Sequence, residues 1–212
     1  MKIFKLVFSP IEVNTYVLAD ESGKCAIIDC GCYHEPEQEE LVKLLESEKL
    51  MPVMLLNTHC HLDHVFGNKF ILEKYNLRTF SCEADEVNRK NATQHSIRFG
   101  LTMETPPEPG SFITDGQVLT FGDIKLVALH VPGHTAGSIA FYCASDGSVF
   151  TGDALFSGSI GRTDLPGGNY DTLINSIRSK LFVLPLSTVV YPGHGNKTTI
   201  EKEILTNPFF GS

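Results

Sequence analysis

The sequence lacks any apolar run long enough to cross a membrane, and it contains no low-complexity segment, linker or internal repeat. Its first eight residues are too few and too charged for a signal peptide with a cleavage site, and they are typical of a β-strand instead. We therefore expect a cytoplasmic protein with no membrane partner, whose six cysteines are reduced. Residues 1–212 are expected to fold as a single domain.

Positive charge is also scarce, because 17 lysines and arginines face 25 aspartates and glutamates, for a formal net charge of -8. Phosphate binding needs clustered basic side chains, so this balance argues against a nucleic-acid partner. It does not argue against metal, because acidic side chains are common ligands. The hydrophobic content of 42% and the charged content of 20% are ordinary for a globular protein.

Strands and helices are predicted to alternate in the first half of the chain. The predicted strands are residues 2–8, 13–19, 25–29 and 53–57. Ser9 and Pro10 separate the first two strands and indicate a hairpin. One helix is expected to open at Pro36, and a second one is expected over residues 65–75.

The second half returns to strands after a stretch without a regular pattern, residues 83–116, which we expect to be a loop that overhangs a site. The later strands are predicted at residues 117–121, 124–130, 138–143, 148–151 and 187–191. A helix is predicted around residues 173–181, and Thr198 to Glu201 fits a capping box before a last short helix. This order favours two sheets covered by helices.

Polar clusters follow four of these strands, at the points where the strands end. The stretch THCHLDHVFG follows strand 53–57 and places three histidines and one aspartate in six positions. Pro-Gly-His, Gly-Asp and Pro-Gly-His-Gly fragments follow three of the later strands. If these strand ends share one edge of packed sheets, seven candidate ligands converge there. They are His59, His61, Asp63, His64, His134, Asp153 and His194.

Seven nitrogen and oxygen donors are too many for one tetrahedral zinc and fit two cations with one shared carboxylate. His59 and His61 are two residues apart on extended chain and therefore point to the same side, whereas Cys60 points away and is not expected to be a nucleophile. Each fragment alone is an ordinary turn. Burying the whole cluster without metal, however, would cost on the order of several kcal/mol in unpaired polar groups.

The run from His59 to His64, followed by His134, Asp153 and His194, resembles the metallo-β-lactamase superfamily in order and approximate spacing. The resemblance implies an α/β fold, the four-layer αββα sandwich, with two divalent metal ions at the sheet edges. Zinc is the first expectation, and iron or manganese are the alternatives. By the same resemblance, His59, His61 and His134 bind one ion, Asp63, His64 and His194 bind the other, and Asp153 bridges them.

Within that superfamily, the segment TGDALFSGSIGRTDLPGG, residues 151–168, is similar to the glyoxalase II-like thioester hydrolases, particularly short bacterial forms that hydrolyse hydroxyacylglutathione. This similarity implies that a hydroxide between the metal ions attacks the acyl carbon of a small thioester, such as S-D-lactoylglutathione, while Asp63 orients it. Full-length glyoxalase II carries a C-terminal helical segment whose basic residues bind glutathione. Little sequence follows His194 here, so the carrier thiol stays open.

Other functions share these ligands. Mononuclear iron persulfide dioxygenases resemble the chain, including the Gly-Arg-Thr-Asp run at residues 161–164, and the continuation at residues 165–168 favours the hydrolase. A lactone-type metallohydrolase and a metal-binding protein without catalysis are further alternatives. Zinc β-lactamases and the ribonuclease branch resemble the chain less.

Two more residues are candidates for roles around the site. Asp29 ends a predicted strand, where it either hydrogen-bonds a ligand imidazole or forms a turn. Arg162 either holds a substrate carboxylate or pairs with Asp164, and we favour the pairing. Cys30 and Cys32 are interpreted as small apolar residues that flank a turn rather than as a metal clip.

Overall fold

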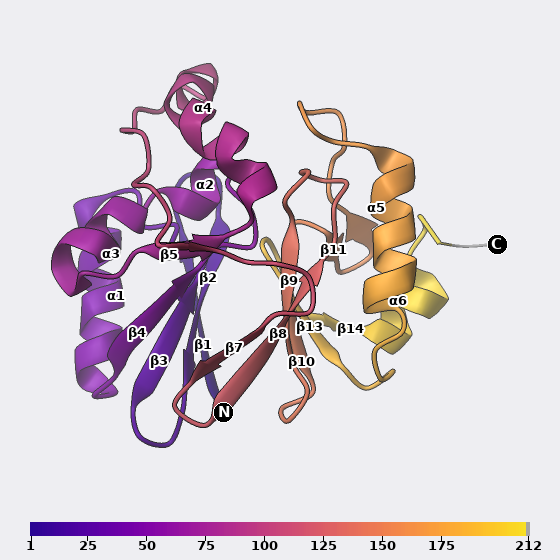
Figure 1. Cartoon of the computed structure of the whole chain (residues 1–212), viewed down its shortest axis with the longest axis horizontal. Helices are drawn as coiled ribbons and strands as arrows, with labels where there is room; N and C mark the ends of the chain where they lie inside the picture. Colours follow the sequence, from indigo (N-terminus) through magenta and orange to yellow (C-terminus); the bar gives the residue numbers. More distant parts are fainter. Residues whose placement is uncertain (211–212) are drawn as a thin grey trace.

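The computed structural model describes residues 1–210, whose strands form two six-stranded sheets and one small two-stranded sheet (Figure 1). The first sheet has the order β1 (Lys2–Phe8), β2 (Val13–Ala19), β3 (Lys24–Ile28), β4 (Met51–Leu56), β5 (Thr79–Ser81) and β6 (Ser111–Phe112). The second has the order β14 (Thr198–Thr199), β13 (Val189–Pro192), β10 (Ser148–Gly152), β9 (Ile139–Cys143), β8 (Ile124–His130) and β7 (Val118–Phe121). The small sheet pairs β11 (Leu155–Phe156) with β12 (Ser159–Ile160).

The predicted hairpin is confirmed, because β1 and β2 pair antiparallel with Lys2 opposite Ala19 and Phe8 opposite Val13. From β3 onward the first sheet is parallel, and the helix α1 (Glu35–Ser47) forms the crossover from β3 to β4. In the second sheet β10 and β13 are also parallel, and α5 (Tyr170–Ser176) and a π-helical turn (Ile177–Leu181) lie between them in the sequence.

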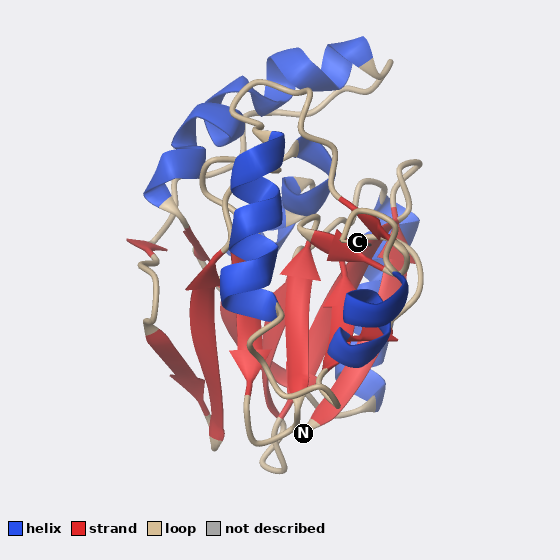
Figure 2. Cartoon of the chain, turned by 90° about the vertical axis from the view of Figure 1, so that its right-hand side faces the viewer, coloured by secondary structure: helices blue, strands red, loops and turns tan. Residues whose placement is uncertain are grey.

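The two sheets pack face to face, and helices cover their outer faces (Figures 1 and 2). The shared core contains Leu18 and Ile28 from the first sheet and Phe141 and Phe150 from the second. Leu41 and Leu45 of α1 and Ile71 of α3 (Asn68–Tyr75) cover the first sheet from outside. Leu173 and Ile177, with Ile200 of α6 (Ile200–Thr206), cover the second sheet. The predicted four-layer αββα sandwich is confirmed.

The prediction of an irregular loop over residues 83–116 is wrong for its first half. A 3-10 turn (Glu83–Asp85) leads directly into the helix α4 (Glu86–Arg98), which stands beyond the sheets at the top of Figure 1. The buried residues of α4 include Asn88, Arg89 and Ser96, so the helix has no apolar stripe that its sequence would reveal. The proline-rich second half has little regular structure, with only β6 in it.

Two other local predictions need correction. The helix expected over residues 65–75 is broken into α2 (Leu62–Val65) and α3, and between them the Gly67 N–H donates to the carbonyl oxygen of Cys30 at 2.8 Å instead of continuing the helix. The last helix starts without the predicted capping box. Its N-cap is Thr199, whose hydroxyl accepts a hydrogen bond from the Lys202 N–H at 3.2 Å, whereas Thr198 donates to the buried Glu203.

No helix within residues 1–210 combines the length and the apolar character that a membrane span requires.

Candidate metal centre

Four strands of both sheets deliver polar side chains to one place. The segment after β4 carries His59, His61, Asp63 and His64, and α2 holds the last two of these. His134 follows β8, Asp153 follows β10, and His194 follows β13. All seven residues that the sequence marks as candidate ligands are brought together, because ligands gather where the carboxyl ends of strands meet in α/β sheets.

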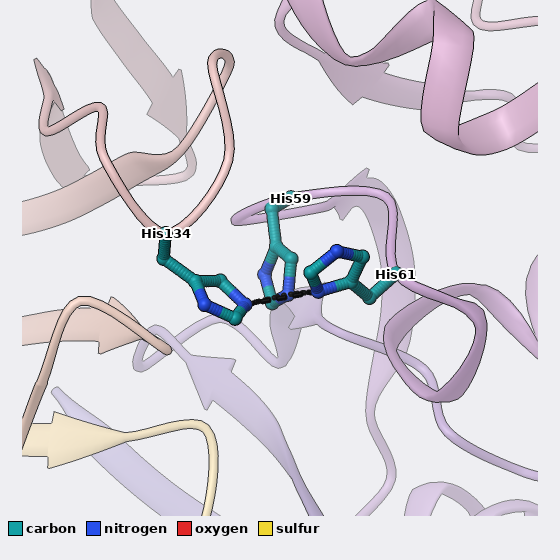
Figure 3. A group of neighbouring side chains, drawn as sticks. All are labelled: His59, His61 and His134. Atoms are coloured by element: carbon teal, nitrogen blue, oxygen red, sulfur yellow. Dashed lines mark hydrogen bonds between the residues drawn. The ribbon is translucent and has the colours of Figure 1, made fainter. Parts of the chain in front are cut away.

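The first group consists of His59, His61 and His134, whose ring nitrogens converge on one point (Figure 3). Nε2 of His59 lies 3.2 Å from Nδ1 of His61 and 3.2 Å from Nε2 of His134, and the last two nitrogens are 2.9 Å apart. Three imidazoles bound to one tetrahedral zinc place their nitrogens about 3.3 Å apart, given bonds of about 2.0–2.1 Å. The group therefore has nearly the dimensions of a three-histidine metal site.

The second group consists of Asp63, His64 and His194. Oδ2 of Asp63 lies 3.1 Å from Nε2 of His194 and 3.5 Å from Nε2 of His64. Carboxylate and imidazole donors in this mixture suit zinc, iron or manganese. The second group thus offers ligands for a cation beside the first, and His59, His64 and Asp153 form a third set that overlaps both groups.

Asp153 lies between the two groups. Its Oδ1 is 3.3 Å from Nε2 of His64, and its Oδ2 is 3.7 Å from Nε2 of His134 and 3.6 Å from Nε2 of His194. One carboxylate therefore faces members of both groups, as a bridging ligand between two cations would.

Two buried atoms of the centre have no hydrogen-bond partner, Nε2 of His64 and Oδ1 of Asp153. They lie near each other, but not in hydrogen-bonding geometry. Leaving buried polar atoms unpaired costs on the order of 1–3 kcal/mol each, so a folded protein normally provides a partner. A cation between them would serve both atoms, and the donor set fits such a group.

The protonation states of His59, His61 and Asp63 suit metal binding. Burial, reinforced by the neighbouring imidazoles, lowers the pKa of His61 to about 3 and that of His59 well below its usual value. Burial opposes ionisation of Asp63, but His64 and His194 outweigh it and lower the pKa of this carboxyl. At neutral pH His59 and His61 are therefore neutral and Asp63 is charged, which are the forms that bind cations.

The far nitrogens of His134 and His194 are held by hydrogen bonds, which fix the ring orientations. Nδ1 of His134 lies 2.8 Å from the carbonyl oxygen of Arg162, and Nδ1 of His194 lies 3.1 Å from that of Glu12. A carbonyl accepts only, so these Nδ1 atoms donate and the Nε2 atoms are left free for a cation.

Asp29 and Arg162, the two residues expected around the site, differ in their contacts. Oδ2 of Asp29 lies 2.9 Å from Nδ1 of His64, and the same carboxylate accepts hydrogen bonds from the N–H and the hydroxyl of Thr58. Asp29 also has a φ of 52°, so it turns the chain as well. Arg162 is exposed and forms two 2.7 Å hydrogen bonds with Asp164, while its side chain lines the cleft.

Three other residues complete the picture of the centre. Cys60 is buried and packs against Val65 and Ala92 rather than facing the ligands. Sequence reasoning missed Asn57, whose side chain donates to the carbonyl oxygen of His64 at 2.8 Å. It also missed Asp85, a buried carboxylate at the start of α4, because an acidic residue in a stretch without a regular pattern gives no signal.

A cleft of ≈ 310 Å³ opens in front of the two groups. Its walls are largely apolar and combine residues that are far apart in the sequence, Ile11, Leu62, Phe99, Leu165 and Pro166. Arg98, His95 and Arg162 add positive or ionisable groups. The cleft is therefore suited to a small molecule with an apolar part and a negative charge.

Comparison with known proteins gives consistent matches over the whole chain. The family model described as the metallo-β-lactamase superfamily matches residues 9–194. Hydroxyacylglutathione hydrolase GloC of Haemophilus influenzae is 36% identical, and the match covers 100% of this chain and 99% of that protein. Among solved structures, the B3 metallo-β-lactamase BLEG-1 superimposes with a TM-score of 0.92 at 32% identity, covering 100% of both chains. TTHA1623 in a di-iron-bound form superimposes with a TM-score of 0.88 at 36% identity, covering 97% of this chain and 99% of the other.

Proposed function

Because the chain belongs to the metallo-β-lactamase superfamily, and is thus a metallohydrolase, we propose that it is a dinuclear enzyme that hydrolyses small acyl thioesters in the manner of glyoxalase II. The observation that carries the proposal is the position of Asp153, whose two oxygens face the first group and the second group. One cation would be held by His59, His61 and His134, the other by Asp63, His64 and His194, and Asp153 would be shared. Zinc is the first choice, and iron and manganese are the alternatives. Between these two, the di-iron form of TTHA1623 favours iron.

The chemistry of the centre follows from these positions. A pair of divalent cations supplies Lewis acidity, which lowers the pKa of water and polarises a carbonyl. Asp63 lies in the cleft wall and its lowered pKa keeps it ionised, so its carboxylate can accept a hydrogen bond from water and orient the oxygen toward the acyl carbon. A thiolate leaves readily, so the site does not need a strong general acid.

The cleft supports a thioester with an acidic carrier. Its apolar wall suits the carbon chain of an acyl group, while Arg98 and Arg162 line the same cleft and supply positive charge for a carrier carboxylate. S-D-lactoylglutathione has both features, and GloC bears the name of a hydroxyacylglutathione hydrolase. The proposal includes a cytoplasmic location and no nucleic-acid or membrane partner, which agrees with the net charge of -8 and with six free cysteines.

A substrate panel with metal analysis tests the proposal. The purified protein is reconstituted with zinc, iron or manganese and assayed on thioesters, lactones, persulfides and a chromogenic β-lactam. We expect about two ions per chain and the highest kcat/KM on a hydroxyacyl thioester. His61→Ala and Asp153→Ala should abolish turnover and lower metal content together, whereas the exposed Asp171→Asn should change neither. Full activity in either ligand variant would contradict the proposal.

The panel also separates the remaining functions. One iron per chain with oxygen uptake on a persulfide would identify a persulfide dioxygenase. Fastest turnover of the β-lactam would identify a β-lactamase, a second candidate that the 32% identity to BLEG-1 over the whole chain favours. Fastest turnover of a lactone would identify a lactonase.

A further inference from the structure

Asp85 is a fully buried carboxylate at the N-terminus of α4. An aspartate in this position usually accepts a hydrogen bond from the backbone of its own helix, but the side chain of Asp85 makes no such bond. Burying a carboxylate is costly unless hydrogen-bond donors surround it, so its donors must come from elsewhere.

The donors come from the two loops that carry the first group. Oδ2 of Asp85 accepts a hydrogen bond from the backbone N–H of Cys60 at 2.7 Å and another from the hydroxyl of Thr135 at 3.1 Å. Cys60 lies between His59 and His61, and Thr135 directly follows His134. A single carboxylate oxygen therefore joins chain segments that lie within one residue of all three histidines.

The other oxygen strengthens this connection. Oδ1 accepts hydrogen bonds from the backbone N–H of Gly137 at 2.9 Å and from the side-chain amide of Asn88 at 3.3 Å. A Cβ on Gly137 would lie 2.7 Å from the backbone nitrogen of Asp85 and 2.8 Å from Oδ1, so only glycine permits this approach. Asn88 belongs to α4, so the helix itself also fixes the carboxylate.

We infer that Asp85 is a positioning residue, which holds the three histidines of the first group in their cation-binding arrangement and thereby sets the affinity of that site alone. The inference rests on the proposed two-cation centre. The second group is positioned by other residues, because Asp29 and Asn57 hold His64. Changing Asp85 therefore weakens one cation site and spares the other.

A zinc titration that resolves the two sites tests the inference on the full chain. Competition with a chromogenic chelator gives two dissociation constants. The constant that rises in His194→Ala belongs to the second group. Asp85→Asn keeps the shape of the side chain but replaces one accepting oxygen with an NH₂ group. This group donates hydrogen bonds, so it faces the existing donors without an acceptor between them. We expect the dissociation constant of the first site to rise about 10- to 100-fold, as for other residues that orient ligands, while that of the second changes less than about threefold.

Two further variants complete the test. Glu83→Gln removes an exposed carboxylate two residues earlier and should change neither constant. Thr135→Val removes one donor to Asp85 and should raise the first constant about three- to tenfold, which keeps the inference testable if Asp85→Asn fails to fold. Equal weakening of both sites, or an unchanged first site, would overturn the inference and leave the metal centre intact. A wild-type chain that bound no zinc would overturn both.

Discussion

Nε2 of His194 lies 3.1 Å from Oδ2 of Asp63, although the two residues come from different sheets. Asp63 lies in α2, just after β4 of the first sheet, and His194 follows β13 of the second. The second cation position therefore forms only when the two sheets are packed together. Asp153, which extends from the second sheet toward both groups, makes the whole centre depend on the same packing.

Removal of metal is expected to destabilise the fold. An ion that binds only the folded chain stabilises it by about 2.7 kcal/mol when its concentration is 100 times its Kd. For a chain of 212 residues, two such ions correspond to a Tm difference on the order of 10 °C. A chelator should lower the Tm by this amount in differential scanning fluorimetry, and zinc should restore it. Asp153→Ala should show a lower Tm than the wild type and a smaller decrease with the chelator, and an unchanged wild-type Tm would contradict the two-cation centre.

The ligand set could be recognised in the sequence because each ligand follows a strand, and strand ends are visible as apolar runs that stop at glycine or at a polar cluster. The positions of β1, β2 and β8 were predictable for the same reason. The helix α4 was not predictable, because the side chains that it buries are largely polar and are paired through hydrogen bonds. Arg89, for example, is buried with Glu86 as its ion-pair partner and the carbonyl oxygen of Pro106 as an acceptor. Such polar contacts produce no periodic pattern of apolar residues in the sequence.

The residues that hydrogen-bond the ligand-bearing segments could not be identified from the sequence either, although they matter for the geometry of the site. Asp85 binds backbone and hydroxyl donors from distant loops, and Asn57 binds a backbone carbonyl. Backbone groups are present at every position, so these partners leave no pattern in the sequence. Asp29 was visible only because it ends a strand.

Gly193→Ala is expected to disturb the centre directly. A Cβ at this position would collide with Oδ1 of Asp153 and lie 2.8 Å from Cε1 of His64. Both residues would have to move, so we expect metal affinity and turnover to fall at least about tenfold, given that residues supporting ligands contribute about 10- to 100-fold. Metal content after dialysis and kcat/KM would measure the effect.

Gly195→Ala is the matched control for this substitution. Its Cβ would meet no atom within 4 Å, but its φ of +74° is unfavourable for alanine. The strain should cost about 1–2 kcal/mol of folding stability and leave metal content unchanged. If both alanine variants lost metal equally, collision with Asp153 would not be the cause.

Arg98→Ala is expected to separate substrate binding from catalysis. Among the hydrogen bonds and ion pairs within residues 1–210, the Arg98 side chain has none, and it lines the cleft. We expect KM to rise about fivefold for a thioester whose carrier bears carboxylates, with kcat unchanged, since exposed charge pairs contribute up to about 1 kcal/mol. A thioester with a neutral carrier should not be affected. Arg162→Ala should have a smaller effect because its guanidinium already binds Asp164, and equal effects on both carriers would contradict the anionic-carrier proposal.

The five buried cysteines are expected to be unreactive in the folded protein. Burial raises the pKa of Cys25 to about 12 and that of Cys60 well above its usual value. Only the thiolate is alkylated, so at pH 8 Cys25 should react about 10³-fold more slowly than an ordinary thiol, and its rate should increase about tenfold for each pH unit up to 12. Iodoacetamide labelling followed by peptide mass spectrometry would measure both quantities.

Cys82 and the unfolded chain are the internal controls for this labelling. Cys82 is only half-buried, so it should be the first site modified in the folded protein, although burial raises its pKa as well. In denaturant all six cysteines should react at similar rates, because burial is lost. Fast labelling of Cys60 in the folded protein would contradict its position against Val65 and Ala92, and would make a thiolate nucleophile next to the histidines a competitor of the hydrolytic mechanism.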